Sequence, residues 1–176
     1  MSSITTYIGK DFDPINPDKN LLEILDIAHS LSLICRCNGH VKYFYSVAQH
    51  CLACAIEAEK RGLSRRIILG CLLHDASEAY LSDVTRPIKK ELDFYLSVED
   101  NLQNIIWEHF IGSGLTKKEK DIIFEIDDEM LSLEFIKLMP KKINEEYKKI
   151  ISNVKCEFEM MDIVRDKFIN FYEKYR

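Results

Sequence analysis

The chain has 176 residues, of which 47% are hydrophobic and 30% are charged. This length is sufficient for one well-packed domain and short for two. With 24 Lys and Arg residues against 29 Asp and Glu, the net charge is −5, which disfavours a polymeric DNA or RNA partner.

No apolar run approaches the length of a membrane span, and the first residues lack the pattern of a signal peptide. We therefore expect a soluble cytoplasmic protein without a membrane partner. The cysteine pairs 35/37 and 51/54 have spacings that admit a structural zinc site. Because Cys51 and Cys54 fall inside a helical stretch without turn residues, we interpret them as apolar fillers and expect free thiols.

The predicted elements are helices. Residues 1–19 contain Asp–Pro and Asn–Pro turn signals and predict an irregular lead-in. Apolar residues at three-and-four spacing then predict helices over about 20–37, 41–61, 64–81, 87–111 with a break near Ser97, 116–138 and 156–175. The polar segment 141–153 predicts a solvated face or connector. We expect a single all-α domain of about six main helices, with a helical core over 20–138 and a C-terminal helical extension over 139–176.

A cluster of polar residues marks the apolar helix predicted over 64–81. Glu78 follows His74 by four residues and Asp75 by three, so one helical face can carry all three side chains. Burying two carboxylates beside an imidazole is costly unless positive charge compensates them, and a divalent metal is the simplest candidate. The alternative is a core histidine satisfied by a neighbouring carboxylate.

Two further residues lie on apolar faces of other helices. His50 is the strongly polar member of its face, although a core histidine bonded to the backbone is the alternative. Asp127 shares a face with Ile123 and Met130, whereas Asp128 lies on a solvated face.

His50 and Asp127, together with His74 and Asp75, make a set of two histidines and two carboxylates that suits Mn, Fe, Co, Ni or Zn. Glu78 is placed to orient or deprotonate water. Asp83 could assist it or cap the next helix.

His50, His74–Asp75 and Asp127 occur in the order H…HD…D. This pattern resembles that of the HD-domain metal-dependent phosphohydrolases. The stretch HDASEAYLSDVTRPIK looks like the deoxynucleotidase branch of that superfamily. The stretches DIAHSLSLICRCNGH (26–40) and FYSVAQH (44–50) are similar to small HD proteins of phages, which include dATP triphosphohydrolases. The resemblance covers roughly residues 5–135.

The resemblance implies metal ligation by His50, His74, Asp75 and Asp127. It makes Glu78 the catalytic carboxylate and Asp83 its partner, and it implies that Arg36 and Lys89 hold phosphate, as their charges allow. Without it, Arg36 would be a cation at a helix C-terminus and Lys89 a solvated lysine. Cys37 stands where relatives often carry an aromatic residue and could line the base pocket.

The function implied is hydrolysis of a small 2′-deoxynucleotide. We expect a dNTP triphosphohydrolase, with dATP or another purine favoured, that releases deoxynucleoside and triphosphate by attack of water on the α-phosphate. The alternatives are a 5′-deoxynucleotidase acting on dNMPs and a non-catalytic nucleotide-binding HD module. The expected cofactor is Co, Mn, Zn, Fe or Ni, with Mg as an optional second ion. A homo-oligomer is expected because a neighbouring subunit often completes the pocket of a small helical domain. If a phage encodes the chain, the expected compartment is the host cytoplasm.

Overall fold

The computed structural model describes residues 3–141 and 150–176. As predicted, these residues form an all-α architecture, to which a two-stranded hairpin is added near the N-terminus. The elements in chain order are β1 (Ile4–Thr5), β2 (Asp11–Phe12), η1 (Lys19–Leu21), α1 (Ile24–Leu33), η2 (Arg36–Gly39), α2 (Val47–Lys60), α3 (Arg65–Leu72), α4 (Glu78–Leu81), α5 (Arg86–Lys89), α6 (Asp93–Ile111), α7 (Lys117–Leu138) and α8 (Met161–Tyr175).

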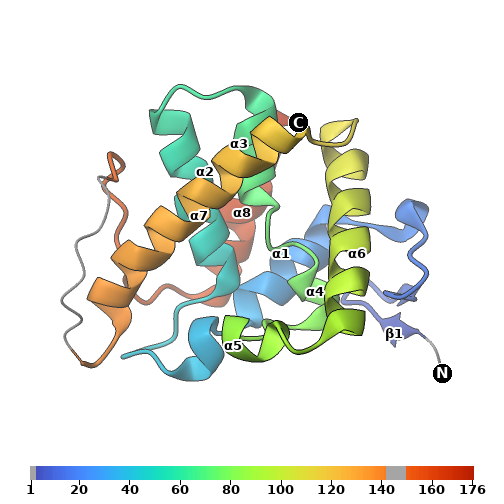
Figure 1. Ribbon diagram of the computed structural model, residues 1–176, viewed down its shortest axis with the longest axis horizontal. Helices are drawn as coiled ribbons and strands as arrows, with labels where there is room; N and C mark the ends of the chain where they lie inside the picture. The colour runs from blue at the N-terminus through green and yellow to red at the C-terminus, as the bar shows by residue number, and fades with distance from the viewer. Residues whose placement is uncertain (1–2, 142–149) are drawn as a thin grey trace.

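The core is organised around α3, which packs against α2, α6, α7 and α8. Figure 1 shows α7 crossing α2 and α3, with α6 at the side. Gly70 makes the close approach of α7 possible, because a Cβ at this position would collide with Cδ1 of Ile123. The sequence of α3 therefore determines how closely α7, which carries Asp127, lies to the centre of the domain.

The N-terminal hairpin differs from the irregular lead-in that the sequence predicts. β1 and β2 pair antiparallel, with Ile4 opposite Phe12. Phe12 is fully buried, and its ring centroid lies 4.4 Å from that of Tyr80 on α4. Each strand has two residues, which is too short for alternating side chains to appear as a pattern.

The chain leaves α1 earlier than predicted and turns sharply before α2. Cys37 and Asn38 have positive φ values of 55° and 50°. The backbone N–H of Arg36 donates to the carbonyl of Tyr45 at 2.9 Å, which ties this segment to the approach to α2. Arg36 is consequently directed into the protein, with 8% exposure, and is not a cation at a helix C-terminus.

The limits of α2 reflect its capping residues. The helix begins at Val47 instead of near Val41, because Ser46 and Gln49 form a capping box in which each side chain bonds the backbone N–H of the other. It ends as predicted, since Gly62 follows with a φ of 68°.

The predicted helix over 87–111 is two helices, and the break lies at Leu92, not near Ser97. Leu92 has φ −115° and ψ 68°, which are not helical values. Pro87 lies in the first turn of α5, and Gly112 ends α6 with a φ of 93°, both as predicted. α7 begins at the predicted capping box, which Thr116 forms with Glu119, and ends at Leu138.

The last helix begins at Met161, five residues later than predicted. Cys156 precedes it and is buried in a small cluster with Tyr45 and Leu138. α8 packs against α1, α2 and α3, so it belongs to the main core. Residues 142–149, within the segment 141–153 for which a connector was predicted, lie outside the described residues.

Candidate metal centre

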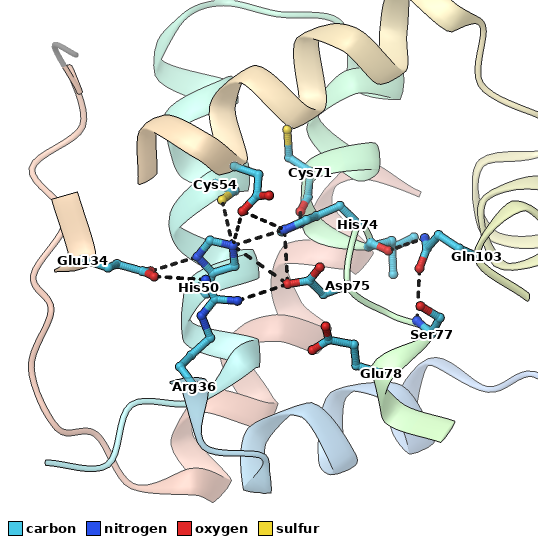
Figure 2. Close-up of polar contacts among 12 residues, drawn as sticks. Arg36, His50, Cys54, Cys71, His74, Asp75, Ser77, Glu78, Gln103 and Glu134 are labelled. Carbon is cyan, nitrogen blue, oxygen red and sulfur yellow. Dashed lines mark hydrogen bonds and ion pairs between the residues drawn. The ribbon is translucent and has the colours of Figure 1, made fainter. Parts of the chain in front are cut away.

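The four side chains predicted as metal ligands meet at one point, although they come from different elements. His50 lies on α2, and His74 and Asp75 lie on the turn after α3 (Figure 2). Asp127 lies on α7. Nε2 of His50 lies 3.1 Å from Nε2 of His74 and 3.0 Å from Oδ1 of Asp127. Nε2 of His74 lies 3.3 Å from Oδ2 of Asp75. The structure therefore brings together all four residues, and both histidines are buried.

The prediction that one continuous helix carries His74, Asp75 and Glu78 is wrong. α3 ends at Leu72 and α4 begins at Glu78, with a turn between them. The three side chains nevertheless line the same pocket.

The turn is formed around the side chain of Gln103 on α6. Its amide N–H donates to the carbonyl of Leu73 at 2.7 Å. Its Oε1 accepts from the N–H of Ser77 at 3.0 Å, a contact that Figure 2 shows. In a continuous helix, Ser77 would donate directly to Leu73. The side-chain amide of Gln103 therefore takes the place of the direct hydrogen bond between Ser77 and Leu73 by bonding to both backbone groups. As a result, the backbone that carries His74 and Asp75 departs from the helix.

The second ring nitrogen of each histidine is also engaged. Nδ1 of His50 lies 2.9 Å from Oε1 of Glu134, and Nδ1 of His74 lies 2.7 Å from the carbonyl oxygen of Cys71. Because a carboxylate and a carbonyl oxygen accept hydrogen bonds, both Nδ1 atoms donate and both Nε2 atoms point toward the shared centre. Metal-binding histidines are commonly oriented by such outer contacts.

The separations between donor atoms fit a single divalent ion. An ion about 2.1 Å from nitrogen and oxygen donors places neighbouring donors about 3.0–3.4 Å apart, for octahedral to tetrahedral angles. The three closest separations, 3.0, 3.1 and 3.3 Å, lie in this range. The buried group of His, Cys and Asp side chains can therefore hold a metal ion.

Charge at the centre also favours a cation. Burial raises the pKa of Asp75 and of Asp127, but the neighbouring imidazoles outweigh this and hold both carboxyls well below their usual range. Burial likewise opposes the charged form of His50 and His74, yet the surrounding acidic groups raise the pKa of both rings. Since the carboxylates remain ionised, they need positive charge nearby, which Arg36 and Arg86 supply together with protons on the imidazoles or a bound metal ion.

Two thiols interpreted from the sequence as apolar fillers lie beside the histidines. Sγ of Cys54 is 3.7 Å from Nε2 of His50, and Cys54 and His74 complete a group of possible ligand atoms within 4.8 Å of one another. Cys51 forms a second such group with His74 and Asp75. All six cysteines are free, as expected. The filler interpretation was incomplete because Cys54, four residues after His50, shares its helical face.

A pocket of about 870 Å³ opens beside these converging side chains. This volume is in the usual range for small-molecule sites. Apolar side chains in its lining are Val84, Pro87, Leu96, Trp107, Phe124, Leu131, Phe135 and Met139. The remaining predicted site residues also line it: Arg36, Cys37, Glu78, Asp83 and Lys89.

Glu78 is a buried carboxyl group with unused hydrogen-bonding capacity. Its Oε2 has no hydrogen-bond partner among the described residues. Burial, reinforced by the negative charges of Asp75 and Asp83, raises the pKa of Glu78 well above its usual value. A carboxyl with a raised pKa can exchange a proton closer to neutral pH, which suits a general acid or base.

The two predicted phosphate-binding cations are held by carboxylates within the pocket. Arg36 places Nη1 3.4 Å from Oδ2 of Asp75 and Nη2 3.4 Å from Oε2 of Glu134. Lys89 places Nζ 2.8 Å from Oε1 of Glu99 and 3.8 Å from Oε1 of Glu78. Lys89 has a side-chain exposure of 19%, so it is not the solvated surface lysine of the alternative interpretation.

Glu134, Gln103 and Arg86 were not among the predicted site residues. Glu134 could have been found because it lies seven residues after Asp127 on the same helical face. Arg86 places Nη2 3.0 Å from Oδ2 of Asp127. No local signal marks Gln103, whose contacts lie 26 and 30 residues away in the chain.

Several buried polar atoms without a partner gather around the pocket. Among the described residues, Nε of Arg36, Oε2 of Glu78 and Nε1 of Trp107 have no hydrogen-bond partner, and all three residues line the pocket. Unsatisfied buried groups are costly, and a polar ligand could satisfy them. Their position therefore supports a ligand site.

Within the described residues, no helix combines the length and the apolar character that crossing a membrane requires.

The chain is 41% identical over 112 residues to the uncharacterized protein YfdR of Escherichia coli, a match that covers 62% of this chain and 59% of the relative. It is 36% identical over 99 residues to an uncharacterized protein of Rhodobacter capsulatus, covering 53% of this chain and 50% of that relative. These matches therefore span less than two thirds of the length of each relative. No model of a known protein family matches the chain.

Proposed function

We propose that the protein is a metal-dependent phosphohydrolase of small 2′-deoxynucleotides, with an HD-type centre. One observation carries the proposal: His50, His74, Asp75 and Asp127 converge beside a pocket whose lining also supplies Glu78 and two cations. A divalent ion bound to these four residues would lower the pKa of a water molecule and polarise a phosphoryl oxygen.

Arg36 and Lys89 bind the phosphate in this proposal. The guanidinium of Arg36 offers a planar fork of donors, and its Nε is still without a partner. Lys89 adds a compact charge on the side of Glu78. Because carboxylates already hold both cations in place, little side-chain entropy is lost when phosphate binds.

Glu78 and Asp83 handle protons. Because its pKa is raised, the Glu78 carboxyl takes up a proton more readily than an ordinary glutamate, and its free Oε2 can accept a hydrogen bond from water. Asp83 lines the same pocket and is placed to assist at the leaving group.

The substrate has two candidate forms. The dNTP remains the first, with the aromatic and apolar residues of the pocket, together with Cys37, available for the base. Charge favours a second candidate, the dNMP. Six acidic residues and four basic residues line the pocket, so one divalent ion brings the sum of their formal charges to zero and leaves no excess positive charge. A monophosphate with about two negative charges is then easier to accommodate than a triphosphate.

A product assay tests the proposal. Each dNTP and dNMP is offered separately to the full chain with Mn²⁺, Co²⁺ or Zn²⁺, and phosphorus NMR resolves triphosphate, pyrophosphate and phosphate. Triphosphate plus deoxynucleoside supports the first candidate, whereas phosphate from dNMPs alone supports the second. We expect His74→Ala to abolish product formation and His109→Ala, an exposed histidine on α6, to retain it. Binding of nucleotide without any product would reject the enzyme and leave the nucleotide-binding module.

A further inference from the structure

Cys54 lies one helical turn after His50 and faces the same centre. Its side chain is buried, and its Sγ is 3.7 Å from Nε2 of His50. Zinc binds sulfur at about 2.3 Å and nitrogen at about 2.1 Å, so a tetrahedral ion shared by the two atoms places them about 3.6 Å apart. The observed separation therefore fits sulfur and nitrogen atoms bound to one ion.

The same ion can also reach the other donors. Sγ of Cys54 and Nε2 of the two histidines form one group in which all ligand atoms lie within 4.8 Å of one another. Oδ1 of Asp127 lies 3.0 Å from Nε2 of His50. Cys54, His50, His74 and Asp127 thus provide a mixed set of one sulfur, two nitrogens and one oxygen, with Asp75 beside it.

We propose that the thiolate of Cys54 is a ligand of this centre, which makes the centre selective for thiophilic ions such as Zn²⁺ and Co²⁺ over Mn²⁺ and Mg²⁺. The inference rests on the metal centre of the proposed function and specifies its cofactor. The Cys54 thiol releases its proton to solvent when the sulfur–metal bond forms. Thiolate ligands favour softer ions, whereas a centre of carboxylates and imidazoles alone also accepts Mn²⁺.

The charges around the site are compatible with a third anionic ligand. Asp75, Asp127, Glu134 and a Cys54 thiolate together exceed the charge of one divalent ion by two. Two arginines supply the balancing positive charge: Nη1 of Arg36 lies 3.4 Å from Oδ2 of Asp75, and Nη2 of Arg86 lies 3.0 Å from Oδ2 of Asp127. A buried anionic centre compensated in this way avoids the cost of an unpaired charge.

Cobalt spectroscopy of the metal-free full chain, titrated with Co²⁺, tests this assignment. We expect the wild type to develop visible d–d bands together with a near-ultraviolet thiolate-to-cobalt charge-transfer band. Cys54→Ser should lose the charge-transfer band, keep the visible bands, and bind Zn²⁺ about 10-fold or more weakly. Its affinity for Mn²⁺ should not change.

Cys51→Ser tests the rival thiol, because Cys51 lies on the same helix, is equally buried and forms the second group of possible ligands with His74 and Asp75. It should keep the charge-transfer band. Cys54→Ala serves as a second variant, and circular dichroism verifies that each variant is folded.

The outcomes separate the two proposals. Retention of the charge-transfer band in folded Cys54→Ser overturns the role of Cys54. A wild type with d–d bands but no charge-transfer band overturns it as well, while the metal centre stands. If Co²⁺ and Zn²⁺ do not bind the wild type, the metal centre and the Cys54 assignment both fall.

Discussion

Glu134 accepts a hydrogen bond from Nδ1 of His50 at 2.9 Å and is almost fully buried. Burial raises the pKa of Glu134, but the charges of His50 and Arg36 outweigh burial and lower it overall, so the group is ionised. An ionised carboxylate holds the His50 proton on Nδ1 and directs Nε2 to the centre. Glu134 is thus a positioning residue that acts through His50.

Glu134→Gln should weaken metal binding by about 10–100-fold, because a neutral amide holds the His50 ring less firmly and makes Nε2 less basic. Isothermal titration of the metal-free protein with Zn²⁺ measures the change. Asp121→Asn removes an exposed carboxylate from the same helix and should leave the affinity as it is. Equal affinities for Glu134→Gln and wild type would exclude a positioning role.

Gln103→Leu should destabilise the protein by about 1–3 kcal/mol, because it removes the bonds to the carbonyl of Leu73 and the N–H of Ser77. We also expect metal affinity to fall, since the released backbone can form the direct helical bond and redirect His74. Urea unfolding and metal titration measure the two effects. Asn101→Ala, which truncates an exposed amide on the same helix, should affect stability only slightly. A stable Gln103→Leu protein with normal metal affinity would show that the turn does not depend on this side chain.

Local signals predicted the fold class and several helix ends. Thr116 with Glu119 starts α7, and Gly112 ends α6, because capping chemistry depends on residues close in sequence. His50 and Asp127 could also be selected because they lie on apolar faces, and His74 and Asp75 because they form a polar cluster with Glu78 in an apolar stretch. The break between α3 and α4 was missed because its cause, Gln103, lies on another helix. Tertiary contacts override local helical pattern at such points.

Arg36 shows a similar limit of the sequence pattern. Without the resemblance, its location at the end of a predicted helix suggested a cation at a helix C-terminus, whereas the positive φ values of Cys37 and Asn38 turn the chain inward. Non-glycine residues rarely adopt this conformation, so no pattern predicts it.

Arg36→Met should destabilise the metal-free protein by about 3–5 kcal/mol, because Asp75 and Glu134 lose the guanidinium that compensates them. The loss should be smaller with saturating Zn²⁺, since the ion then balances Asp75. Urea unfolding with and without Zn²⁺ gives both values. Arg65→Met removes an exposed arginine and should change stability little in either state. Equal losses for Arg36→Met with and without metal would argue against electrostatic coupling between Arg36 and the centre.

The start of α7 should show an acid-dependent loss of stability. Glu119 accepts from Nε of Arg66 at 2.7 Å and from the N–H of Thr116 at 2.8 Å, which lowers its pKa from 4.5 to about 2. Because the folded-state pKa is depressed, the stabilisation is complete above about pH 4.5 and is lost as pH falls toward about 2. Wild type should exceed Glu119→Gln by roughly 1–2 kcal/mol near neutral pH, and urea midpoints should converge at the acidic end. In an Arg66→Met background, the pH-dependent difference should shrink, since the largest cause of the pKa shift is absent. A difference between wild type and Glu119→Gln that stays constant across this pH range would show that the ion pair does not stabilise the helix start.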